Sequence, residues 1–135
     1  MLVSTKFATP KMPQSKALYV SYIIMNILFV CTENKLRSAT AEAVFSSYPN
    51  VVAIGAGTNK DAETPVSGDL IEWADAILVM EKFHKVKISS KYGDLLKDKK
   101  VSILAIQDNY GYMDVELVKI LEKRVPKYVP IQKYV

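Results

Sequence analysis

The chain has 135 residues, half of them hydrophobic and 24% charged, which predicts one domain with an apolar core and argues against disorder. Eighteen Lys and Arg against fourteen Asp and Glu give a formal net charge of +4, which suits anionic substrates, and the lack of arginine-rich blocks disfavours nucleic-acid binding. A single cysteine and a single histidine exclude an intrachain disulfide framework and a cysteine-rich zinc site, and they favour a reducing cytoplasmic setting with neither metal nor cofactor.

Residues 1–24 are predicted to be a flexible N-terminal extension. The first sixteen residues are largely polar, contain two prolines and show no hydrophobic periodicity. Met25 directly precedes the first predicted strand. We therefore expect residues 25–135 to form the folded domain, and we expect this domain to keep its fold and activity without the extension.

From Asn26 onward, short apolar runs alternate with helical segments. Strands are predicted at 27–30, 51–54, 76–80 and 101–106, and helices at 38–48, 65–73, 82–91 and 115–124. This alternation predicts an α/β fold, with a four-stranded parallel sheet in a single domain and helices on both faces. In such sheets ligands bind beyond the carboxyl ends of the strands, where strand order reverses, and the first strand usually lies there. Cys31 stands at the carboxyl end of that first strand.

The residues after this thiol are suited to binding phosphate. If the loop wraps inward, its backbone N–H groups form a concave anion site at the start of a helix. The guanidinium of Arg37 can hold two phosphate oxygens at once. The positive charge of Arg37 and the start of the helix also favour a thiolate at Cys31, and the hydroxyl of Ser38 can donate to the sulfur. The predicted phosphate-binding residues are Thr32, Glu33, Asn34, Lys35, Leu36, Arg37 and Ser38.

A thiolate beneath a bound phosphate monoester is placed for in-line attack on phosphorus. The product is a cysteinyl phosphate that water then hydrolyses, while the loop amides and Arg37 stabilise the moving charge. The leaving oxygen needs a proton, which an Asp facing Cys31 would supply. The alternative is a buried core cysteine and a surface arginine, but the strand before and the serine and helix after favour a functional site.

The stretch ILFVCTENKLRSATAEAVF resembles the signature of the low-molecular-weight protein tyrosine phosphatases, V-C-x-x-N-x-x-R-S-P-x-A-E-A-x-F. The segments AGT at 56–58 and WADAILVME at 73–81 are similar to further motifs of this family. The resemblance covers most of residues 26–124 and implies a short, bacterial-type, phosphatase-like domain. It implies that Cys31 is the nucleophile, that Arg37 clamps phosphate, that Asn34 braces the loop and that Ser38 tunes the thiolate.

Four features depart from the family pattern. Glu33 replaces the usual glycine and brings a carboxylate near a site for dianions, so its side chain must point away or affinity suffers. Ala39 replaces proline at the start of the helix, where proline is favourable but not required. Leu36 stands where the family often has a second, protective cysteine, which leaves Cys31 open to over-oxidation. The segment between the fourth strand and the last helix is also compressed.

That compressed segment, IQDNYGYMD, must contain the general acid. The resemblance implies an Asp in a D-P-[YFW] loop, and Asp108 is the closest match. Asp114 is the alternative, although it also suits the N-cap of the following helix. Tyr110 and Tyr112 are candidates for the cleft wall, with a role as loop anchors equally open.

Two other residues are interpreted as having no role in catalysis. His84 lies in a lysine-rich stretch and is expected to be solvated, and Trp73 is expected to pack in the core.

The sequence therefore predicts a phosphomonoesterase acting through a phosphocysteine, most plausibly on phosphotyrosine in proteins, with small phosphomonoesters also open and inorganic phosphate as the product. Two alternatives remain: a non-catalytic phosphate-binding or signalling module, and an arsenate reductase that relies on an external thiol because no other cysteine is present. No nucleic-acid or membrane partner is expected. The physiological substrate and the oligomeric state stay open.

Overall fold

The computed structural model describes residues 24–131, so nearly all of the predicted extension and the last four residues lie outside the described part. The prediction for the extension is therefore untested. The described elements are β1 (Met25–Cys31), α2 (Arg37–Phe45), β2 (Val51–Gly57), α3 (Gly68–Trp73), β3 (Ala76–Val79), α4 (Lys82–Tyr92), the 3-10 turn η1 (Gly93–Leu96), β4 (Lys100–Ile103), α5 (Val115–Arg124) and the 3-10 turn η2 (Val125–Lys127).

The four strands form one parallel sheet in the order β2-β1-β3-β4. The chain moves from β1 to one side for β2 and then to the other side for β3, so strand order reverses at β1. The last residue of β1, Cys31, pairs with Gly57 at the end of β2. The predicted α/β fold is confirmed, and Cys31 lies at the topological switch point of the sheet, where such folds bind ligands.

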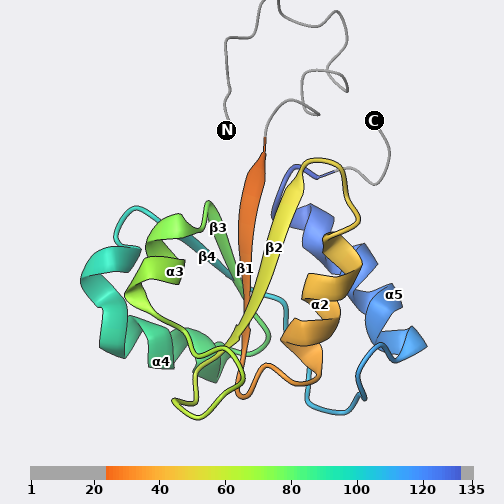
Figure 1. Ribbon diagram of the computed structural model, residues 1–135, viewed down its shortest axis with the longest axis horizontal. Coiled ribbons are helices and arrows are strands. Elements are labelled where there is room, and N and C mark those ends of the chain that lie inside the picture. The colour runs from red at the N-terminus through yellow and green to blue at the C-terminus, as the bar shows by residue number, and fades with distance from the viewer. Residues whose placement is uncertain (1–23, 132–135) are drawn as a thin grey trace, which may run out of the picture.

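Helices cover both faces of the sheet, with α2 and α5 on one face and α3 and α4 on the other (Figure 1). Successive residues of a strand point to opposite faces, so β1 contributes to two hydrophobic clusters. Ile27 and Phe29 pack with the α2 and α5 side, where the rings of Phe29 and Phe45 stack at 5.5 Å. Leu28 and Val30 pack on the opposite face. Burial of β1 on both faces explains its unbroken apolar sequence.

Several element boundaries differ from the prediction. β2 continues three residues beyond the predicted end, through Gly57. α3 begins at Gly68 rather than at residue 65, because Pro65 forms a bridge with Gly57 and Ser67 caps the helix by accepting a hydrogen bond from the N–H of Leu70. β4 ends at Ile103, although backbone hydrogen bonds from the next few residues continue toward β3. The last helix, α5, has the predicted bounds.

Trp73 is half-buried and packs against the cluster on the α3 and α4 face, as expected. Within residues 24–131, no helix combines the length and the apolar character needed to cross a membrane.

Candidate active site

The loop after β1 folds back around the sulfur of Cys31. Asn34 adopts a left-handed backbone conformation with φ of 57°, which asparagine tolerates better than most residues. This turn directs the N–H of Asn34 toward the Cys31 Sγ at 3.2 Å. The side-chain oxygen of Asn34 accepts a hydrogen bond from the Ser38 hydroxyl at 2.6 Å. One asparagine thus fixes both the shape of the loop and the first residues of the helix that follows.

Cys31 and Ser38 share a proton network beneath the loop. The Cys31 Sγ and the Ser38 Oγ are 2.9 Å apart, and either atom can be the donor. Since a hydroxyl has one hydrogen, Ser38 can donate either to Asn34 or to the sulfur at any moment. A thiol at Cys31 therefore matches the first arrangement and a thiolate the second. Once the thiol has lost its proton, a rotation of the Ser38 hydroxyl is enough to turn its hydrogen bond from Asn34 to the sulfur.

Two glycines at the end of β2 let this loop pack closely against the sheet. A Cβ atom at Gly55 would lie 2.7 Å from the Ser38 carbonyl oxygen and even closer to the Asn34 side chain. A Cβ at Gly57 would lie 2.6 Å from the Ala62 Cβ and would clash with the carbonyl of Thr32. The G-A-G sequence at 55–57 thus matches the close approach of the two segments.

Arg37 reaches from the first turn of α2 into the protein interior. Its Nη1 donates to Glu81 Oε2 at 2.6 Å and to the Ile106 carbonyl at 2.7 Å. These contacts use both hydrogens of Nη1 and leave the edge formed by Nε and Nη2 for a ligand. Nε lies 3.8 Å from Asp108 Oδ1, beyond hydrogen-bond distance. The arginine is therefore anchored at one nitrogen and free at the edge that binds two phosphate oxygens.

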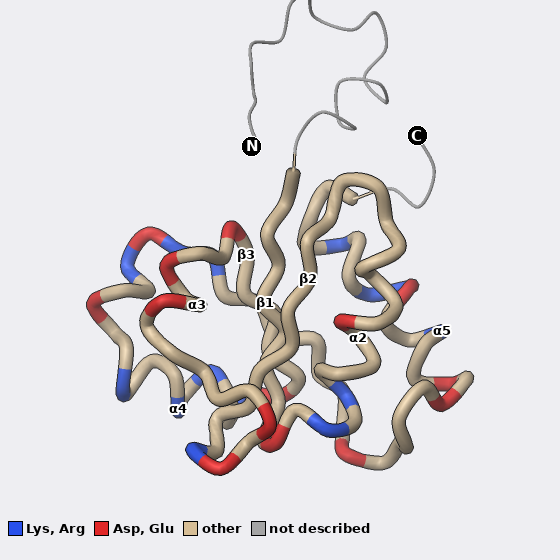
Figure 2. Tube along the Cα trace, viewed as in Figure 1, with Lys and Arg blue, Asp and Glu red and all other residues tan. Residues whose placement is uncertain are grey.

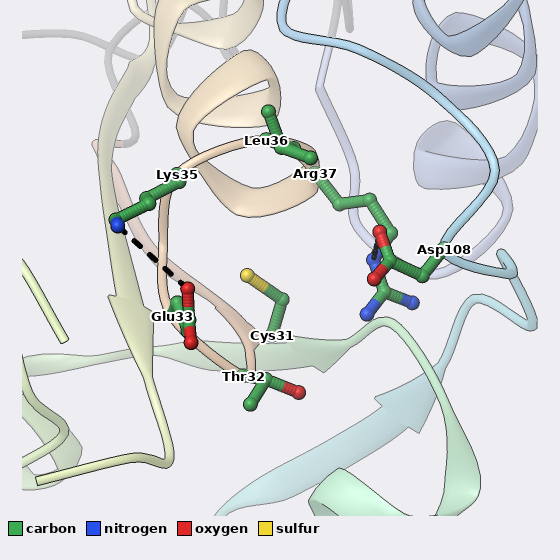
Figure 3. A pocket seen from close by; sticks show the side chains of 7 residues that line it. All are labelled: Cys31, Thr32, Glu33, Lys35, Leu36, Arg37 and Asp108. Atoms are coloured by element: carbon green, nitrogen blue, oxygen red, sulfur yellow. Dashed lines mark ion pairs between the residues drawn. The ribbon is translucent and has the colours of Figure 1, made fainter. Parts of the chain in front are cut away.

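One cavity of about 320 Å³ opens over these groups. Figure 3 shows the Cys31 sulfur between two ion pairs, Glu33 with Lys35 on one side and Arg37 with Asp108 on the other. The lining residues are Cys31, Thr32, Glu33, Lys35, Leu36, Arg37 and Asp108. Asn34 and Ser38 are buried and support the loop from below.

α2 begins at this cavity without a side-chain cap on its first N–H groups. Both α3 and α5 have such a cap, from Ser67 and Asp114. Uncapped N–H groups and the positive end of the helix dipole together favour an anion at this position.

The other predicted acid and the two tyrosines do not line the cavity. Asp114 is the N-cap of α5, and its Oδ1 accepts a hydrogen bond from the Glu116 N–H at 2.8 Å. Tyr110 packs against the core, and Tyr112 is exposed. Within the described residues, no group of three or more His, Cys, Asp and Glu side chains is arranged to hold a metal ion.

No protein-family model and no curated protein matches the chain. Solved structures do match. The YwlE arginine phosphatase from Geobacillus stearothermophilus is 22% identical, with a TM-score of 0.62 over 76% of this chain and 92% of that chain. A YwlE mutant from Bacillus subtilis is 28% identical, with a TM-score of 0.58 over 73% and 95%. The tyrosine phosphatase Wzb from Escherichia coli K30, solved with phosphate, is 17% identical, with a TM-score of 0.58 over 78% and 96%.

The chain has the fold of these structures, that of the low-molecular-weight protein tyrosine phosphatases.

Two departures from the family pattern shape the mouth of this cavity. The side chain of Glu33, in place of the family's glycine, pairs with Lys35 at 3.8 Å and is about half exposed. The lysine offsets part of its negative charge, and solvent screens the remainder. Leu36, in place of the family's second cysteine, gives the rim an exposed apolar side chain.

The prediction for His84 is wrong: its side chain is fully buried. Its Nδ1 accepts a hydrogen bond from the Glu81 N–H at 3.0 Å, so Nε2 carries the hydrogen and donates to Thr32 Oγ1 at 3.0 Å. Since Glu81 also accepts a hydrogen bond from Arg37, His84 connects Thr32, the residue after Cys31, with the partner of the arginine. The E-x-x-H spacing at 81–84, which matches a helix-capping box, was the available sequence signal.

The stability of the protein is expected to fall between pH 6.5 and pH 4. The pKa of His84 is lowered from 6.5 to about 4, mainly by burial and next by the positive charge of Arg37; Lys87 adds to this, while Glu81 and Asp108 oppose it. The unfolded chain therefore binds more protons than the folded chain in this range. The contribution of neutral His84 to the free energy of unfolding is fully present above pH 6.5 and is lost as the pH falls toward 4. The loss is on the order of 3 kcal/mol, from about 1.4 kcal/mol per pKa unit.

Urea unfolding at several pH values measures this loss. His84→Asn keeps an acceptor for the helix cap but does not titrate, so its free energy of unfolding should change much less over the same range. Equal pH dependence in the native chain and the variant would assign the effect to other groups.

Proposed function

We propose that the chain is a cysteine-dependent phosphatase that acts on phosphorylated protein side chains, with phosphotyrosine as the first candidate substrate. The observation that carries the proposal is the arrangement of Cys31, Arg37 and Asp108 around one cavity at the end of β1. A nucleophile, a phosphate clamp and a proton donor are the groups that phosphomonoester hydrolysis through a covalent intermediate requires.

In the first step, the Cys31 thiolate attacks phosphorus in line with the leaving oxygen. The S–P bond forms as the P–O bond breaks, and the protonated carboxyl of Asp108 gives its proton to the leaving oxygen. The Nε and Nη2 edge of Arg37 and the free N–H groups at the start of α2 stabilise the charge on the three equatorial oxygens. The products are the free alcohol or phenol and a cysteinyl phosphate.

In the second step, a water molecule attacks the phosphorus of the cysteinyl phosphate. The Asp108 carboxylate accepts a proton from this water, the S–P bond breaks, and inorganic phosphate leaves. The sulfur departs as a thiolate that accepts hydrogen bonds from the Asn34 N–H and the Ser38 hydroxyl. No metal or redox partner enters this balance.

Phosphoarginine is a second candidate substrate, favoured by two carboxylates in the cavity wall. The carboxylates of Glu33 and Asp108 both line it, and a guanidinium leaving group pairs well with carboxylates. No aromatic side chain is among the described lining residues to stack on a phenol. One of the similar structures is named an arginine phosphatase and another a tyrosine phosphatase, so both substrates occur among its structural relatives.

Glu33→Gln separates these two substrates. If phosphoarginine is the substrate, the variant should lose severalfold in kcat/KM on a phosphoarginine peptide, since one charge-assisted hydrogen bond is lost. On a phosphotyrosine peptide it should be unchanged or faster, because a carboxylate near a dianion is removed. A uniform loss on both peptides would contradict a role for Glu33 in substrate choice.

The general acid is tested with two matched variants. Asp108→Asn should lower kcat by about a hundredfold on substrates with a basic leaving group, because proton donation contributes factors of this order. The loss should be much smaller for an aryl phosphate with an acidic leaving group, which departs without a proton. Asp114→Asn is the control, since asparagine also caps helices well and this residue does not line the cavity. The reverse pattern would assign the acid to Asp114.

The assay that tests for enzymatic activity itself is hydrolysis of an aryl phosphate near pH 6 by the native chain. Binding of phosphate or vanadate without turnover would replace the enzyme with a phosphate-binding module. Arsenate-dependent oxidation of an added thiol would instead support the reductase alternative.

A further inference from the structure

A second cavity of about 260 Å³ lies between the loop after β2 and helix α4. The Tyr92 hydroxyl donates to the Val66 carbonyl at 3.1 Å and ties these two segments together. The lining residues are Thr58, Asn59, Lys60, Pro65, Val66, Lys87, Ile88, Lys91 and Tyr92. We call this the lysine pocket, because its charged lining residues are three lysines and it has no carboxylate in its wall.

The lysines of this pocket are available to a ligand. None of them forms a salt bridge within the described residues, in contrast to Lys35 and Lys119, which pair with acidic neighbours. Lys91 lies with its Nζ 5.5 Å from the ring centre of Tyr92, which keeps this ammonium beside the pocket wall. Figure 2 shows the positive positions along α4 and on the loop after β2, with negative ones farther along that loop. Asp61 and Glu63 of the same loop do not line the pocket.

The lysine pocket shares a wall with the active site. The N–H groups of Thr58 and Asn59 donate to the carbonyls of Cys31 and Thr32 at 2.8 and 2.9 Å. Cys31 and Thr32 line the active-site cavity, and Thr58 and Asn59 line the lysine pocket. The two cavities are therefore separated by the spacing of hydrogen-bonded backbones, about 5 Å. An extended peptide advances about 3.3 Å per residue, so about two residues cover the step across the shared wall, and a side chain within about three residues can enter the pocket.

We propose that the lysine pocket binds an acidic side chain, Asp or Glu, located within about three residues of the phosphorylated residue in a protein substrate. This inference rests on the proposed phosphatase function and names the class of substrate. Charge favours one placement of such a peptide, since three lysines and no carboxylate line this pocket, whereas both cations of the first cavity, Lys35 and Arg37, have a carboxylate beside them. Sequence preference thus comes from the loop after β2 and from α4, and not from the phosphate site.

The test compares two phosphopeptides that differ only at the positions flanking the phosphorylated residue, with Glu in one and Gln in the other. The native chain should hydrolyse the acidic peptide with about fivefold higher kcat/KM, mainly through a lower KM, because exposed ion pairs contribute small factors each. The double variant Lys87→Gln/Lys91→Gln should bring this ratio close to one. Higher salt should also reduce the ratio, since these charges are exposed.

The matched control is Lys119→Gln/Lys123→Gln, which removes the same charge from α5, on the other face of the sheet. It should keep the native preference, and both double variants should hydrolyse a small aryl phosphate at the native rate. A ratio near one in the native chain, or the same ratio in both double variants, would overturn the inference while leaving the phosphatase intact. If the native chain hydrolyses no aryl phosphate, the proposed function fails. In that case the affinities of the native chain for the two peptides are measured by calorimetry. Tighter binding of the acidic peptide supports the inference, and equal affinities overturn it.

Discussion

Cys31→Ser is expected to abolish turnover, with a loss in kcat on the order of 10⁶ as for loss of another covalent nucleophile. Serine keeps the size of the side chain but is a far weaker nucleophile without a general base, and no described His or carboxylate lies within hydrogen-bond distance of the Cys31 sulfur. Phosphate affinity should change only a few-fold, because the loop N–H groups and Arg37 bind the anion. Steady-state hydrolysis and calorimetric phosphate titration measure the two effects separately.

Ser38→Ala provides the matched comparison for this variant. It keeps the thiol but removes the hydroxyl that lies 2.9 Å from the sulfur. Loss of a hydrogen bond to a charged group predicts a decrease in kcat of about tenfold to a hundredfold. Because Ser38 stabilises the departing thiolate, a burst of product should appear before the slower steady state. Residual turnover in Cys31→Ser equal to that of Ser38→Ala would show that Cys31 is not the nucleophile.

Arg37→Lys is expected to lower kcat/KM by about a hundredfold to a thousandfold, as for the removal of a preorganised donor to the transition state. The charge remains, but a lysine cannot hold Glu81 and Ile106 with one nitrogen and present a planar pair of donors to phosphate. Affinity for phosphate and affinity for vanadate should both fall. The vanadate affinity should fall more, since the donor pair matches the trigonal geometry of the transition state.

Arg124→Lys is the control for the structural part of this effect. Arg124 also donates from Nη1 to two backbone carbonyls of the same segment, those of Leu104 and Ala105, at 2.9 and 2.8 Å. It does not line the active-site cavity. Its replacement should therefore lower stability without a large change in kcat/KM. A comparable loss of activity in both variants would show that Arg37 acts by holding the segment rather than by binding phosphate.

The α/β fold could be predicted from the sequence because its signals are local. Each strand is a short apolar run, and burial on both faces imposes such a run at β1. The position of Cys31 at the switch point was predicted because the first strand of such sheets usually lies there. The bounds of α3 were missed because the backbone on either side of Pro65 hydrogen-bonds to Gly57 at the end of β2, an interaction that helix propensity does not contain.

The environment of His84 could not be predicted in this way. Its neighbours in sequence are lysines and exposed apolar residues, which are typical of a solvated helix surface. Its partners, Thr32 and Glu81, lie on the loop after β1 and at the cap of α4, and the pairing of β1 with β3 brings them together. The same holds for Arg37, whose partners Glu81 and Ile106 are 44 and 69 residues away along the chain.

The anchoring of the segment between β4 and α5 has a consequence for how this protein can change. Arg37 and Arg124 hold it through carbonyl oxygens, and Thr40 holds its far end through the N–H of Met113. Main-chain atoms are the same in nearly every amino acid, so these contacts place almost no demand on the exposed side chains at 107 and 109, unlike the buried Leu104 and Ile106. Substitutions at positions such as 107 and 109 can therefore accumulate, or be introduced in libraries, while Asp108 stays in register with the thiol. The acid-bearing segment is thus a suitable place to alter leaving-group preference without rebuilding the phosphate site.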